Sequence, residues 1–79
     1  MKAFILIETT VGKAKEVTAA LKQLDEIESA DAVTGPYDII AKLETENRTN
    51  IVMAKIKSIP GVSRTAVCAT MKGGEGPGF

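Results

Sequence analysis

Residues 33–40, Val-Thr-Gly-Pro-Tyr-Asp-Ile-Ile, decide how this chain folds, because they place a short polar turn between two apolar segments. Gly35 and Pro36 favour a bend there, since glycine accepts positive φ and proline restricts φ to about −65°. Asp38 follows directly, where the chain should re-enter a sheet through Ile39 and Ile40. A carboxylate held at such a strand edge can bind a small cationic group. The turn therefore joins two predicted strands and is the first candidate for a binding site.

Outward from this turn, apolar residues follow a strand–helix–strand order on each side. The pattern predicts strands over residues 3–7, 27–34, 38–44 and 62–71, with helices from residue 13 to about 24 and from about 47 to 59. Ala14, Val17, Leu21 and Leu24 form the apolar stripe of the first helix, and Ile51, Val52, Ile56 and Ile59 form that of the second. We expect Thr45 or Asn47 to cap the second helix, and residues 60–61, Pro-Gly, to end it.

The two strand–helix–strand halves predict an α+β, ferredoxin-like fold. Right-handed crossovers give a four-stranded antiparallel sheet with both helices on one face. In the first and third strands, residues of both parities are apolar, so these strands should be buried on both faces. We therefore expect the face without helices to pack against a second subunit.

Composition sets the broad class of the protein. A chain of 79 residues makes one domain, and its single cysteine, Cys68, permits no internal disulfide. Cys68 lies in an apolar strand and is expected to be buried. A net charge of zero does not suggest a nucleic-acid-binding surface, and neither a membrane span nor a charged leader is seen. These features indicate a cytoplasmic protein, with a domain over residues 1–72 and a flexible, glycine-rich tail over 73–79.

Binding is better supported than catalysis. The chain has no histidine, no paired nucleophile and base, and no metal-ligand spacing, so we expect no catalytic residue, metal or cofactor. Asp38 either accepts hydrogen bonds from turn amides or binds a ligand ammonium group. Tyr37 either walls that pocket or lies at a subunit contact, while amides around Gly35 could bind a carboxylate. Thr34 and Thr65 could add hydroxyl groups, and together these residues suggest a receptor for a zwitterion.

Residues 33–40, followed by residues 59–65 (Ile-Pro-Gly-Val-Ser-Arg-Thr), resemble the effector-binding domain of the Lrp/AsnC family of transcription regulators, also called the RAM domain. The resemblance covers residues 1 to about 72. It implies a dimeric αβ-barrel, further assembly into an octamer or similar ring, and amino-acid effectors bound between dimers. Carried over by position, the ligand-binding residues are Gly35, Tyr37, Asp38 and Thr65. Val67 departs from the family pattern, which often has a hydroxyl residue there.

The resemblance implies a non-catalytic module that binds an amino acid, oligomerises, and takes part in transcriptional regulation of amino-acid metabolism. The family's amino-terminal helix-turn-helix does not precede the first strand, so the chain resembles the stand-alone form of the domain. Such a form would contact no nucleic acid itself and could co-assemble with a full-length paralogous regulator. Two alternatives remain: a small dimeric αβ-barrel enzyme, and a purely structural oligomerisation module.

Overall fold

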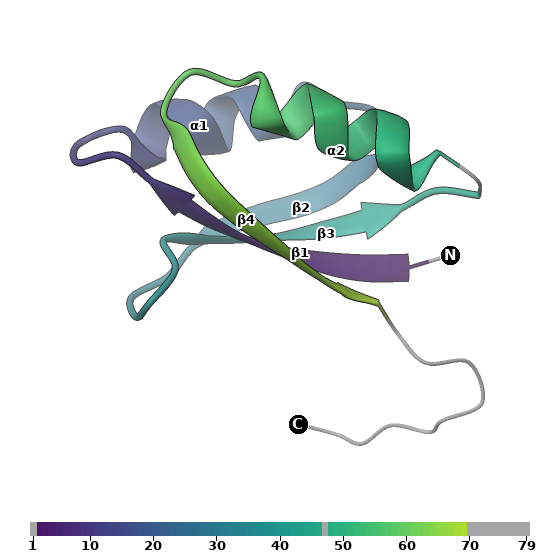
Figure 1. The fold of residues 1–79 in the computed structure, drawn as a ribbon, viewed down its shortest axis with the longest axis horizontal. Helices are drawn as coiled ribbons and strands as arrows, with labels where there is room; N and C mark the ends of the chain where they lie inside the picture. Colours follow the sequence, from purple (N-terminus) through teal and green to yellow (C-terminus); the bar gives the residue numbers. More distant parts are fainter. Residues whose placement is uncertain (1, 47, 70–79) are drawn as a thin grey trace.

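The computed structural model describes residues 2–46 and 48–69. Six elements follow one another along the chain: β1 (Lys2–Thr9), α1 (Ala14–Leu21), β2 (Ile27–Ala32), β3 (Ile39–Glu44), α2 (Thr49–Lys57) and β4 (Val62–Ala69). This is the predicted βαββαβ order (Figure 1). The expected tail at 73–79 and the possible cap Asn47 lie outside the described residues.

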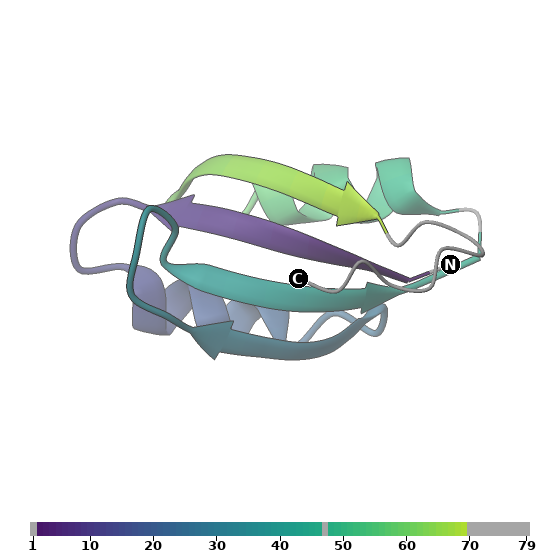
Figure 2. The same cartoon turned by 90° about the horizontal axis from the view of Figure 1, so that it is seen from below.

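The strands form one antiparallel sheet in the order β2-β3-β1-β4. Both helices lie against the same face of this sheet, and the opposite face carries no helix (Figures 1 and 2). The ferredoxin-like prediction is therefore confirmed. Because β1 and β3 are the central strands, each is hydrogen-bonded to a neighbouring strand on both sides.

The hydrophobic core lies between the sheet and the helices. Alternate residues of the central strands face it, as expected for a sheet with one covered face. The core consists of Ala3, Ile5, Ile7, Val17, Leu21, Ile27, Ala30, Ile39, Ala41, Leu43, Val52 and Ile56. In β3, Ile39, Ala41 and Leu43 are buried on the core face, and Ile40 lies half-buried on the other.

The helices differ in detail from the predictions. Helix α1 ends at Leu21, and Leu24 packs against the core from the following turn. Thr45 is buried and does not cap α2: Arg48 occupies the cap position and makes no side-chain cap bond. Ile51 is 53% exposed, so the predicted apolar face was wrong at that position. The core side of α2 is formed by Val52 and Ile56.

The second sheet face is open in the single chain. Phe4 is 39% exposed, Leu6 and Ile40 are half-buried, and Cys68 is exposed. The prediction that Cys68 is buried is thus wrong for the single chain, whereas burial of β1 and β3 on both faces requires a second subunit and stays a prediction. The register places Phe4 opposite Cys68, and Leu6 opposite both Ile40 and Ala66. We call this apolar patch, made of Phe4, Leu6, Ile40, Ala66 and Cys68, the open sheet face.

Candidate functional site

The loop between β2 and β3, residues 33–38, has the bend that its sequence predicts. Gly35 has φ of +142°, a conformation that residues with a side chain rarely adopt. The amide of Val33 donates to the carbonyl oxygen of Asp38 at 2.9 Å and closes the base of the loop. Thr34 and Gly35 are exposed at its tip. The loop is therefore anchored at its base while its outermost residues remain accessible.

Asp38 is held by the end of β1. Its amide donates to the carbonyl oxygen of Ile7 at 2.9 Å. Its carboxylate oxygen Oδ2 accepts hydrogen bonds from the amide and the hydroxyl of Thr9, at 2.8 and 3.1 Å. These partners belong to another strand, not to the turn amides considered from the sequence. Among the described residues, Oδ1 receives no hydrogen bond, so one side of a fixed, half-buried carboxylate is left to accept a donor.

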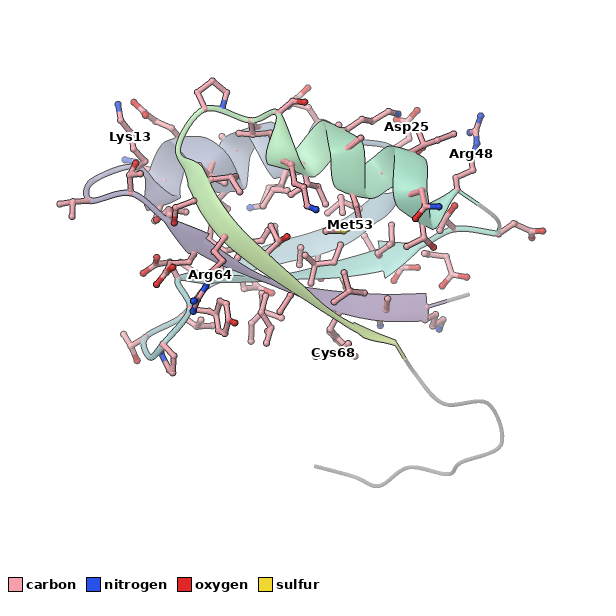
Figure 3. All side chains as sticks on the ribbon, viewed as in Figure 1. Lys13, Asp25, Arg48, Met53, Arg64 and Cys68 are labelled. Atoms are coloured by element: carbon pink, nitrogen blue, oxygen red, sulfur yellow. The ribbon has the colours of Figure 1, made fainter. Side chains whose placement is uncertain are left out.

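Tyr37 lies beside the last strand. The guanidinium group of Arg64 is 5.8 Å from the centre of the tyrosine ring, within the range of a cation–π contact. Arg64 also pairs with the neighbouring Glu8, at 3.5 Å between Nε and Oε1. The two contacts connect the β2–β3 loop to β4 across the end of β1. Arg64 lies on the side of the sheet without helices (Figure 3).

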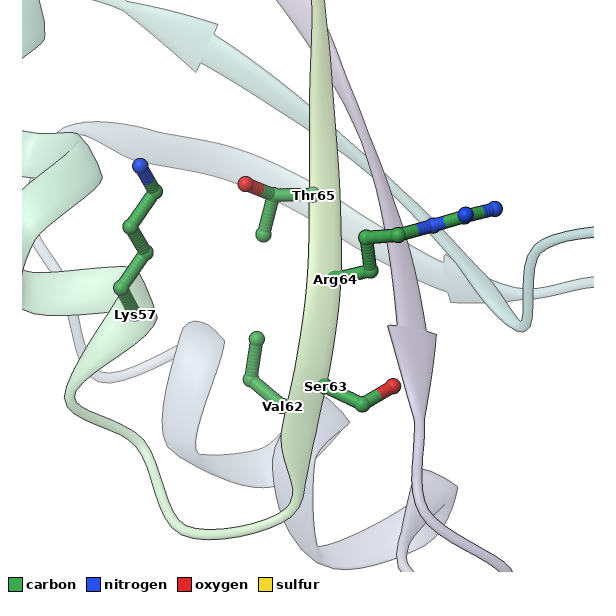
Figure 4. A pocket seen from close by; sticks show the side chains of 5 residues that line it. All are labelled: Lys57, Val62, Ser63, Arg64 and Thr65. Carbon is green, nitrogen blue, oxygen red and sulfur yellow. The ribbon is translucent and has the colours of Figure 1, made fainter.

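Thr65 lies in a different place. It is in register with the buried Ile7 and so projects toward the helix-covered side of the sheet, opposite to Arg64 (Figure 4). There it lines a pocket of about 360 Å³ together with Lys57, Val62, Ser63 and Arg64. Tyr37 and Asp38 do not line this pocket. The structure thus brings together Thr34, Gly35, Tyr37 and Asp38 on one loop but does not bring Thr65 to them within one chain.

A further ionic cluster connects the α1–β2 turn to α2. Glu26 has a side chain only 12% exposed, and its Oε2 lies 3.6 Å from Lys55 Nζ and 3.9 Å from Arg48 Nη1. A hydrogen bond with its own backbone and these two cations lower the pKa of Glu26 below 4.5, against an opposing effect of burial. Sequence inspection missed this cluster because Glu26 and its partners are more than twenty residues apart. Its position between elements indicates a structural role.

No group of three or more His, Cys, Asp or Glu side chains in residues 2–46 and 48–69 is placed to hold a metal ion. Neither helix in those ranges is long and apolar enough to cross a membrane.

Comparison with known proteins points to one family. Residues 2–73 match the family model described as the Lrp/AsnC ligand binding domain. The HTH-type transcriptional regulator FL11 of Pyrococcus abyssi is 39% identical over 74 residues, which are 91% of this chain and 49% of FL11. The chain thus spans about half the length of the curated relatives it matches.

Solved structures resemble the chain in fold. The hypothetical protein PHS023 from Pyrococcus horikoshii superposes with a TM-score of 0.77 at 33% identity, and the match covers 91% of this chain and 92% of that one. Escherichia coli AsnC superposes with a TM-score of 0.82 at 22% identity over 99% of this chain and 55% of AsnC. At that identity the likeness to AsnC concerns the fold alone.

Proposed function

The chain belongs to the Lrp/AsnC ligand-binding domain family, and from this membership we propose that it is a non-catalytic sensor that binds a free amino acid. The binding would be coupled to assembly of the domain with further copies. Its relative FL11 is a transcriptional regulator, so the process that the sensor serves is proposed to be transcription of amino-acid metabolism genes, in the cytoplasm.

The anchored carboxylate of Asp38 is the observation that carries this proposal. Thr9 fixes one carboxylate oxygen and leaves the other able to accept a hydrogen bond from an ammonium group. Amides at the exposed tip, near Thr34 and Gly35, would bind the carboxylate of the same amino acid, and Tyr37 would wall the site. A charge-assisted hydrogen bond to Asp38 would contribute about 1.5–3 kcal/mol.

Calorimetric titration of the twenty amino acids tests the role of Asp38. The informative variant is Asp38→Asn, because the amide oxygen of asparagine can still accept the hydrogen bonds from Thr9. We expect it to weaken binding of the effector by about 10- to 150-fold, the equivalent of 1.5–3 kcal/mol. Asp31→Asn, at an exposed position on β2, is the matched control and should bind as the wild type does. Equal affinity in all three proteins would refute the role of Asp38.

The open sheet face supports the proposal that the domain is at least a dimer. Apolar side chains on β1, β3 and β4 form a patch that a single chain leaves accessible, and a second copy of the same face would cover it. Leu6 lies at the centre of this patch in the register. We expect Leu6→Glu to yield monomers in light-scattering mass measurements. Ile51→Glu, which places the same charge on exposed α2, should leave the mass unchanged; a dimeric Leu6→Glu protein would contradict the proposal.

Higher assembly is the remaining part of the proposed function. We propose that dimers associate into an octamer or similar ring and that the chain can co-assemble with a full-length regulator of its family. A ligand that binds one assembly more tightly than another shifts the population toward it. Mass measurements with and without the effector identified by calorimetry would detect this shift. If the protein dimerises but binds none of the twenty amino acids, it is a structural oligomerisation module instead.

A further inference from the structure

The pocket between α2 and β4 contains two polar groups that face one another. Figure 4 shows the side chain of Lys57 extending from the end of α2 alongside β4, with the hydroxyl of Thr65 directed toward the same space. Val62 contributes an apolar side chain to the lining. The pocket has a volume of about 360 Å³, and none of the described residues that line it is acidic.

Lys57 and Thr65 differ from the other polar residues of this pocket in lacking partners. Among the described residues, no ion pair is formed by Lys57 and no side-chain hydrogen bond by Thr65. The Ser63 hydroxyl instead donates to the carbonyl oxygen of Glu8 at 2.9 Å, and Arg64 pairs with the Glu8 carboxylate. The pocket therefore offers one ammonium group and one hydroxyl to an incoming acceptor.

A cation at the end of a helix often serves only to balance the helix dipole. In α2 both Lys55 and Lys57 lie in the last turn; Lys55 is paired with Glu26, whereas Lys57 forms no ion pair among the described residues. The side chain of Lys57 extends alongside the pocket that it lines. Lys57 can therefore stabilise the end of the helix and still offer its ammonium group to a ligand in the pocket.

We propose that this pocket receives the side-chain carboxylate of the effector, so that the effector is an acidic amino acid. The inference rests on the proposed function, in which the β2–β3 loop binds the amino and carboxylate groups that all amino acids share. Since Thr65 and Asp38 do not meet within one chain, the loop of one copy and the Lys57 pocket of another would bind the two ends of the ligand. Lys57 would form a charge-assisted bond and Thr65 a hydrogen bond with the side-chain carboxylate.

Glutamate and glutamine test the proposal, because they differ only in the charge and hydrogen-bonding character of one terminal group. Aspartate and asparagine form a shorter pair of the same kind. We expect the wild type to bind one acidic member at least about tenfold more tightly than its amide, as measured by calorimetry. Lys57→Gln should abolish this preference while leaving the affinity for the amide unchanged. Lys22→Gln, which removes an exposed lysine at the end of the other helix, should retain it.

The other possible results distinguish this inference from its alternatives and from the proposed function. Loss of affinity for acid and amide alike in Lys57→Gln would show that the pocket takes the α-carboxylate, and would overturn the side-chain assignment. Equal or tighter binding of a neutral amino acid by the wild type would overturn it too. If Asp38→Asn weakens binding but Lys57→Gln does not, this inference fails and the proposed function stands. If acidic amino acids bind through Lys57 with no effect of Asp38→Asn, the inference stands and the proposed amine contact fails.

Discussion

Gly61 offers a sharp test of how the β4 end of the sheet is packed against α1. It lies in the turn between α2 and β4, with φ of +104°, and its carbonyl oxygen accepts a hydrogen bond from Thr10 at 2.8 Å. A Cβ atom at this position would lie 2.9 Å from Cβ of Lys13 and 3.0 Å from Cγ2 of Val17. Gly61→Ala therefore introduces backbone strain and a steric clash at the same point.

The two effects can be given separate magnitudes. An L-residue held at positive φ costs about 1–2 kcal/mol. Inserting a methyl group into a packed site costs about 1–3 kcal/mol more. The clash cannot be relieved cheaply, because Val17 is fully buried and the Lys13 contact is to the Cβ next to its backbone. We expect Gly61→Ala to lower the free energy of unfolding by about 2–5 kcal/mol, a large part of the stability of a small domain.

Two other glycines isolate the strain from the clash. Gly12 and Gly35 also have positive φ, +80° and +142°, but a Cβ at either would meet nothing within 4 Å. Gly12→Ala and Gly35→Ala should thus each cost only about 1–2 kcal/mol. The measurement is urea unfolding followed by circular dichroism at one fixed protein concentration, because assembly would change the apparent stability. If Gly61→Ala is no more destabilising than the two controls, the packing of this turn against α1 is not as described.

Two further predictions concern α2 and its ionic contacts. Ile56→Ala should lower the free energy of unfolding by about 2–5 kcal/mol because Ile56 is fully buried, whereas Ile51→Ala at an exposed position should change it by less than about 0.5 kcal/mol, both measured by urea unfolding. The pKa of Glu26 is lowered in the folded state, so its contribution to stability is present above pH 4.5 and is lost as the pH falls through the folded pKa. Unfolding curves between pH 7 and 3 should show a smaller acid-induced loss for Glu26→Gln than for the wild type, and parallel loss in both would contradict this.

Periodicity predicted the order of elements correctly because each stripe of apolar residues had a buried face to occupy. It could not define where α1 ends. Leu24 continues the three-four spacing of the helix, and it does pack on the core, but from a turn. An apolar stripe records which residues face the core and not the backbone conformation that brings them there.

Ile51 shows the opposite error. Ile51 and Val52 are adjacent, and neighbouring positions on a helix point about 100° apart, so only one could face the core fully. Val52 is spaced four residues before Ile56, which fixes the buried side. The spacing of Val52 and Ile56 was already visible in the sequence, and the predicted apolar face wrongly included Ile51.

The sequence indicated the loop that carries the candidate site but not the contacts that hold its residues in place. The turn and Asp38 were identified by local chemistry, whereas the Thr9 partner is 29 residues away. The direction of Thr65 also depends on a distant feature. The register between β1 and β4 shifts between Glu8 and Thr9, so Ser63 has no partner of its own in the ladder. The extra residue shifts the alternation of side chains between the two sheet faces from Val62 to Arg64, and no short sequence motif indicates it.

Because Thr65 lies apart from the loop within one chain, the proposed function predicts that the affinity for the effector depends on protein concentration. Residues that one chain holds apart can contact one ligand only if a second chain supplies half of the contacts. Binding free energy would then be shared with association, so dilution below the assembly constant should weaken the apparent affinity for the effector. Titrations at protein concentrations on both sides of the assembly transition measure this directly. An affinity that is the same for dispersed and assembled protein would place the whole ligand on the Asp38 loop of a single chain, leaving Thr65 outside the site.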